Sequence, residues 1–137
     1  MFSGCSGLTR APKLPATELE PDCYFQMFYG CNGLTKAPVL PASKLVKNCY
    51  YMMFLHCRNI NYVKCLATEN SAIDCTKSWL SGVAATGTFV KADGMNGWLE
   101  NSDSNATLNP DNKGYPAGWT VKTVSEEAAE QSQQNQP

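Results

Sequence analysis

The sequence contains one histidine, no long apolar run and almost no net charge, and each shortage excludes a class of protein. Eleven Lys/Arg against 12 Asp/Glu leave a formal charge of -1, which gives no general attraction to nucleic acid or anionic lipid. No apolar run approaches the roughly 20 residues of a membrane span, and no charged-then-apolar signal segment opens the chain. We therefore expect no nucleic-acid partner and no membrane insertion. The missing signal leaves open that the sequence is a piece of a longer secreted protein.

Sequence motifs typical of enzymes are also missing. The chain has no nucleophile elbow, HExxH motif, Walker loop or glycine fingerprint. His56 and Cys57 are adjacent, so their side chains point to different sides of a strand or short helix and do not form a Cys–His pair. Glu18 and Glu20 fall in a variable loop and are typical of solvated surface. We expect neither catalysis nor a cofactor.

What the chain does have is a repeat of 26 residues. The units 1–26 and 27–52 agree at 15 of 26 positions, and the unit 53–78 keeps a skeleton that includes Met53, Phe54 and Cys57. A fixed period of this length is the mark of a fold in which each unit buries its apolar face against its neighbours. The columns of recurring apolar residues give the predicted core: Cys5, Cys31 and Cys57; Cys23, Cys49 and Cys75; Leu8, Leu34 and Ile60; Leu14, Leu40 and Leu66.

Each unit divides into two parts. Cys23, Met27, Phe28 and Cys31 have the spacing of one face of a short helix or 3₁₀ segment. The run 34–40 then predicts a short strand, kinked at its proline because proline has no N–H to donate to a ladder.

The cysteines are interpreted as buried packing residues. Their number, seven, is odd and leaves at least one thiol unpaired, which weakens a disulfide framework. Stacked parallel side chains also have poor geometry for a disulfide bond. Seven residues separate Cys23 from Cys31, whereas zinc prefers two to four.

The repeat becomes irregular after residue 78. Residues 79–92 align as a fourth, degenerate turn with Phe89 in the column of Val63, which completes a repeat region over 1–92. Residues 93–124 are predicted to be a C-terminal cap and loop, in which Trp98, Tyr115, Trp119 and Val121 cover the last turn. The loop 101–114 departs from the EF-hand template and is not expected to hold calcium. Residues 125–137 lack apolar periodicity and predict a disordered tail.

The pattern Phe-x-Gly-Cys-x-x-Leu-Thr-x-Ala-Pro-x-Leu-Pro, at residues 2–15 and 28–41, resembles the BspA-like, or Treponema-type, leucine-rich repeat. The Cys- and Pro-rich variants of gut Bacteroidetes look closest. The resemblance covers residues 1–78, and the segment after them looks like the C-terminal end of such proteins. It implies an α/β fold, a right-handed leucine-rich-repeat solenoid of about three to four coils, with short strands and short helical segments. It also implies secretion or display on the cell surface, and adhesion. The period of 26 is longer than is usual for the family.

Outward strand positions give the predicted ligand surface. Repetition stacks them into rows: Thr9, Thr35 and Asn61; Arg10, Lys36 and Tyr62; Lys13, Val39 and Cys65, with Lys64 nearby. This basic edge with one aromatic favours a protein or glycan ligand, although charges such as Arg10 and Lys36 are equally typical of a solvated face. The alternative function is a structural or receptor-binding piece of a larger surface or phage fibre assembly, with self-association through an uncapped N-terminal end.

Overall fold

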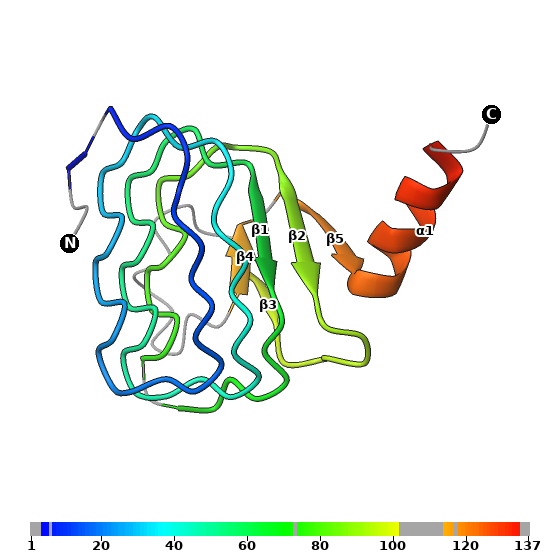
Figure 1. Ribbon diagram of the computed structural model, residues 1–137, viewed down its shortest axis with the longest axis horizontal. Helices are drawn as coiled ribbons and strands as arrows, with labels where there is room; N and C mark the ends of the chain where they lie inside the picture. The colour runs from blue at the N-terminus through cyan, green and yellow to red at the C-terminus, as the bar shows by residue number, and fades with distance from the viewer. Residues whose placement is uncertain (1–3, 6, 73, 102–113, 117, 135–137) are drawn as a thin grey trace.

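The computed structural model describes residues 4–5, 7–72, 74–101, 114–116 and 118–134. Strands β1 (Tyr62–Cys65), β2 (Thr88–Lys91) and β5 (Thr120–Thr123) form a parallel sheet in the order β1-β2-β5. Strands β3 (Leu99–Asn101) and β4 (Gly114–Pro116) form a second, two-stranded parallel sheet. One helix, α1 (Val124–Gln134), follows β5 directly and lies outside the sheet (Figure 1). None of the helices in these residues is long and apolar enough to cross a membrane.

The predicted fold class, an α/β leucine-rich-repeat solenoid with about three to four coils, is wrong. The described residues give a small protein with a three-stranded parallel sheet, a two-stranded sheet and one helix. Short helical segments were expected in every repeat, but the described part of each repeat has turns in their place. The helix lies beyond the repeats, at the C-terminal end of the described chain (Figure 1).

The expected helical segments are rows of consecutive turns because the backbone has a positive φ at every fourth residue. An α-helix needs φ near −63° throughout, so each such residue stops helical hydrogen bonding. Asp, Asn and Gly, which tolerate this conformation best, occupy several of these positions. The positive φ values are: Asp22 62°, Gln26 54° and Gly30 70° in the first row; Asn48 57°, Met52 54° and His56 62° in the second; Asp74 54°, Ser78 56° and Gly82 81° in the third.

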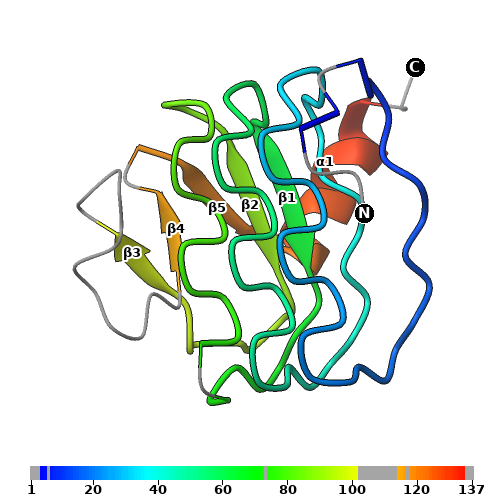
Figure 2. The same cartoon turned by 90° about the vertical axis from the view of Figure 1, so that its left-hand side faces the viewer.

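Backbone hydrogen bonds join the three rows of turns side by side (Figure 2). In the first two rows, every second N–H donates to the next row, as Phe28 does to the Met53 carbonyl at 3.0 Å and Phe54 to the Trp79 carbonyl at 3.0 Å. The N–H groups between them donate within the row, as Cys31 does to the Phe28 carbonyl at 3.0 Å. Because both sets of amides are satisfied, this irregular backbone can be buried at little cost.

The core lies between the rows of turns and the sheet. Aromatic rings stack from row to row, with Phe28 and Phe54 centroids 5.7 Å apart and Tyr50 and Trp79 centroids 5.9 Å apart. The sheet contributes Val63 and Phe89, which are fully buried and lie opposite each other in the register of β1 and β2.

The residues expected to form the cap pack against this end of the core. Trp98 stacks on Trp79 with ring centroids 5.5 Å apart, and the ring centroids of Tyr115 and Phe89 are 5.6 Å apart. The Trp119 indole donates a hydrogen bond to the Ala84 carbonyl at 2.8 Å. Val121 lies opposite Phe89 in the register of β5 and β2.

The residues of the predicted core columns differ in how deeply they are buried. Eight of the twelve residues are buried: Cys31, Cys57, Cys49, Cys75, Leu34, Ile60, Leu14 and Leu40. Cys5 and Cys23 are exposed, while Leu8 and Leu66 are half-buried. Each exposed cysteine belongs to the first unit of the repeat. Within the described chain, this unit has a neighbouring unit on one side.

Leu66 was assigned to the wrong column. Leu40 bridges Cys65 and not Leu66. The Ala37 N–H donates to the Tyr62 carbonyl, 25 positions later, whereas the Leu40 N–H donates to the Lys64 carbonyl, 24 positions later. The second segment therefore contains one residue more than β1 before this point. Pro38 accounts for the difference, because a proline cannot join the ladder and the chain bulges around it. As a result Cys65, expected to face outward, is fully buried.

The tail also differs from the prediction. Residues 125–137 were expected to be disordered, yet α1 covers Val124–Gln134. A capping box starts the helix: the Glu126 N–H donates to the Thr123 hydroxyl at 3.1 Å, and the Thr123 N–H donates to the Glu126 carboxylate at 3.1 Å. Asp93 adds to this start by accepting hydrogen bonds from the N–H of Ser125, at 3.0 Å, and from its hydroxyl.

Candidate functional site

The predicted ligand surface is divided between a groove and a covered part. Arg10 and Lys36 are exposed and stand on the successive segments 9–15 and 35–41. Together with three further predicted surface residues they line a groove of about 500 Å³. The five predicted residues in this basic groove are Thr9, Arg10, Lys13, Thr35 and Lys36.

An apolar pocket of about 280 Å³ continues from the basic groove. It shares Ala11, Lys13, Pro38 and Val39 with the groove and is otherwise lined by Leu14 and three further prolines. Val39 is 44% exposed, unusually high for a large aliphatic side chain beside a core. The prolines are Pro12, Pro15, Pro38 and Pro41.

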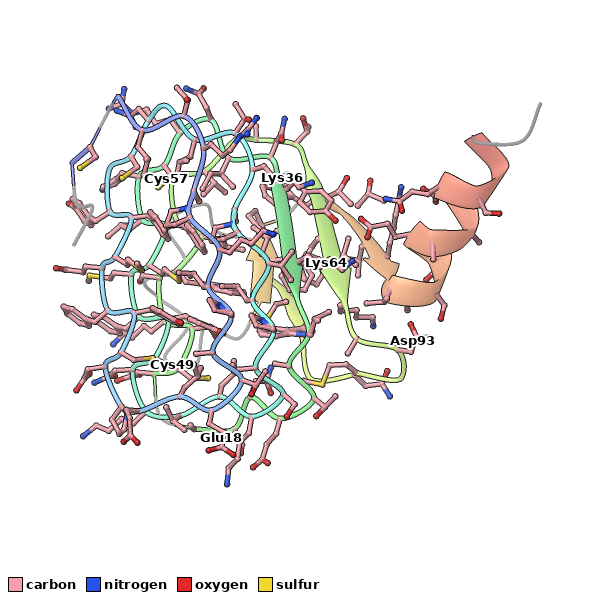
Figure 3. All side chains as sticks on the ribbon, in the orientation of Figure 1. Glu18, Lys36, Cys49, Cys57, Lys64 and Asp93 are labelled. Carbon is pink, nitrogen blue, oxygen red and sulfur yellow. The ribbon has the colours of Figure 1, made fainter. Side chains whose placement is uncertain are left out.

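The remaining predicted surface residues lie on or beside β1, and Asn61 is exposed there. Tyr62 and Lys64 face α1, where both bind Glu127. The Tyr62 hydroxyl donates a hydrogen bond to the Glu127 carboxylate, and the Lys64 Nζ lies 3.0 Å from the other carboxylate oxygen. Figure 3 places Lys36 and Lys64 on the side of the sheet that faces the helix.

The electrostatics of this contact favour a charged carboxylate. Partial burial acts to raise the pKa of Glu127, but hydrogen bonds from Tyr62 and Lys64 outweigh it and lower that pKa. Burial raises the pKa of Tyr62, and the neighbouring carboxylate raises it further. The Lys36 Nζ lies 4.6 Å from the centre of the Tyr62 ring in a cation–π contact. This contact connects the basic groove to the part of the predicted surface that α1 covers.

The buried thiols lack the properties of nucleophiles. Burial raises the pKa of Cys49, Cys57 and Cys65 to about 12 in each case, against an ordinary 9.0. The Cys57 thiol donates a hydrogen bond to the Phe28 carbonyl of the neighbouring row at 2.8 Å. A protonated thiol is a poor nucleophile and a poor metal ligand.

Metal-ligating side chains do not gather in the described part of the chain, where no group of three or more His, Cys, Asp or Glu side chains could hold an ion. His56 is exposed and stands edge-on to Tyr29, with ring centroids 5.7 Å apart. Residues 102–113, which include most of the loop considered for calcium, lie outside the described residues.

Glu127 is the site residue that the sequence reasoning missed. A signal for it exists, since the run 123–126 has the Thr-x-x-Glu spacing of a capping box and is followed by good helix formers. The sequence reasoning also missed the groove walls Ala11, Pro12 and Pro38, whereas Val39 stands in a predicted surface row.

Comparisons of the chain with protein-family models, curated proteins and solved structures found no match.

Proposed function

We propose that the chain is a non-enzymatic binding module that holds a protein or glycan ligand at its basic groove. One observation supports the proposal above others: five exposed polar side chains from two successive repeats line a single groove, and three of them are cationic. Among the described residues that line it, none is acidic. Such a groove can attract and orient a ligand that carries carboxylates or many hydroxyl groups.

The small groove sets the affinity that this module can reach. Specific protein interfaces bury about 800 Å² on each partner. The basic groove and its apolar pocket are smaller, because they are lined by two short segments. We therefore expect weak binding by one copy and useful binding when several copies are linked. This behaviour suits adhesion by a secreted or cell-surface protein, the location that the BspA-like resemblance predicts.

The experiment that tests this function compares two variants on a glycan array and on a displayed peptide library. Arg10→Ser with Lys36→Ser removes two exposed cations of the groove, and Lys47→Ser removes an exposed lysine outside it. Loss of bound ligands in the first variant and retention in the second supports the proposal. Equal binding by both variants would exclude the groove.

The alternative is a structural piece that associates end to end, and one observation favours it. In the first row of turns Phe25 is 41% exposed, and no described backbone N–H donates to the carbonyls of Cys23 and Phe25. A second copy could stack there and use both acceptors. Light scattering over a concentration series decides between the two: a strict monomer at high concentration argues against stacking.

A further inference from the structure

We propose that the ligand of the basic groove is an extended acidic peptide, which binds as an added β-strand between residues 9–15 and 35–41. This inference depends on the proposed function, because it names the ligand class for the same groove. Three features of the two segments support it: their separation, their backbone groups and the pattern of their side chains.

The two segments are not paired with each other. No backbone hydrogen bond joins 9–15 to 35–41, both of which are fully described. Residues 35–41 do pair on their other side, where the Asn61 N–H donates to the Thr35 carbonyl at 2.9 Å and the Leu40 N–H donates to the Lys64 carbonyl at 3.0 Å. Figure 2 shows the first segment, in blue, running apart from the cyan one. The groove and its apolar pocket occupy the space between them.

Both walls present backbone groups that a strand could use. Residues 9–15 make no hydrogen bond with other described backbone, and neither Lys36 nor Val39 donates its N–H to described backbone. Pro12, Pro15, Pro38 and Pro41 have no N–H, so the walls hold more acceptors than donors. The best occupant therefore supplies a regular series of N–H groups. An extended peptide does this, whereas a proline-rich segment does not.

The side chains of the two walls define which peptide fits. Leu14, Ala37 and Leu40 are buried on the inner side, 8%, 3% and 0% exposed. Arg10, Lys13 and Lys36 are exposed at the rim. A strand between the walls would place alternate side chains inward and outward. Small apolar residues then meet the inner side, and acidic residues meet cations on both flanks.

The chain already binds a carboxylate one strand away. Glu127 is held by Tyr62 and Lys64 of β1, and Lys36 contacts the same tyrosine ring. This contact covers the part of the surface beside β1 and leaves the groove on the other side of Lys36 uncovered. Acidic side chains are therefore suited to the whole edge formed by β1 and residues 35–41. A separate chain can reach this edge at the groove.

A labelled peptide of alternating glutamate and valine, seven residues long, tests the inference by fluorescence anisotropy. The intact chain should bind it, and N-methylation of the three valines should weaken binding about tenfold or more, since buried hydrogen bonds are lost. Replacing every glutamate by lysine should abolish binding. Arg10→Gln with Lys36→Gln should weaken it about tenfold, whereas Lys47→Gln should leave it unchanged. Circular dichroism of each variant confirms that the chain is folded.

The possible failures separate this inference from the function on which it depends. Equal binding of the N-methylated peptide would overturn strand addition while leaving a side-chain site in the groove. No peptide binding, together with array ligands that depend on Arg10 and Lys36, would overturn the peptide inference and keep the proposed function. Array and peptide binding that are both indifferent to these residues would overturn both.

Discussion

The hydroxyl of Tyr62 donates a hydrogen bond to the carboxylate of Glu127, which lies 65 positions later in the chain. Tyr62 belongs to β1, whereas α1 follows β5, and β2 lies between these two strands in the sheet. The contact therefore spans the sheet and ties the last described element to its first strand. Lys64 adds an ion pair at 3.0 Å, in which the side chains of Lys64 and Glu127 are 24% and 13% exposed.

Removing this carboxylate should release the helix. We expect Glu127→Ala to cost roughly 1 kcal/mol, because a hydrogen bond to a charged group and a partly screened ion pair are lost together. The loss should be local, with faster amide hydrogen exchange in α1 and little change in the rows of turns. Glu130→Ala is the matched control, since its pair with Lys122 is more exposed and should contribute less. Equal exchange in both variants would contradict a special role for Glu127.

The same contact should make α1 sensitive to acid. The pKa of Glu127 is lower in the folded chain than in the unfolded chain, so its stabilisation is present above the unfolded value, about 4.3, and is lost as the pH falls through the folded value. Hydrogen bonds from Ser125 lower the pKa of Asp93 in the same direction. Hydrogen exchange of α1 measured between pH 6 and pH 3 should show loosening in acid. Glu127→Gln should remove part of this dependence, and an unchanged pH profile would contradict the assignment.

Two neighbouring aromatic stacks should differ sharply in their contribution to stability. Phe54 is fully buried against Phe28, and truncating it to alanine should cost about 3–5 kcal/mol through lost burial and a cavity. Phe25 stacks on Tyr51 with a centroid distance of 5.1 Å but is 41% exposed. Phe25→Ala should cost less than about 1 kcal/mol. Urea unfolding of both variants measures the difference, and similar midpoints would contradict the described core.

The thiols should fall into two classes. Cys5 and Cys23 are exposed, whereas the other five cysteines are buried. An aromatic disulfide reagent at neutral pH should therefore modify two thiols quickly in the folded protein and all seven after denaturation. Fast reaction of Cys49 or Cys57 in the folded chain would contradict both their burial and their raised pKa values.

The repeat could be predicted because residues that recur with a fixed period have equivalent surroundings in the fold. Phe54, Cys57 and Cys75 recur with the period and are buried. The helical interpretation failed for a physical reason: over nine residues, a turn repeated every four residues puts its apolar side chains at nearly the same spacing as an α-helix. Periodicity alone therefore cannot separate the two. The positive φ of Gln26 and Met52 favours turns over a helix. Neither Gln nor Met indicates such a backbone conformation in a sequence.

The candidate site was only partly predictable. Arg10 and Lys36 could be placed on neighbouring segments from the period alone. The inward position of Cys65 could not, because the extra residue around Pro38 shifts the register by one. The contact of Tyr62 with Glu127 depends on α1, which was missed because a helix held by polar contacts lacks an apolar stripe.

The rows of turns place a strict demand on chain length. Positive-φ residues recur every four positions in each row and occur at matching places in the next, as Asp22, Asn48 and Asp74 do. Deleting one residue from the middle row would leave its left-handed positions and its donating amides out of step with both neighbours at once. A lost residue is therefore more damaging here than an exchanged one, and variation between repeats should take the form of substitutions.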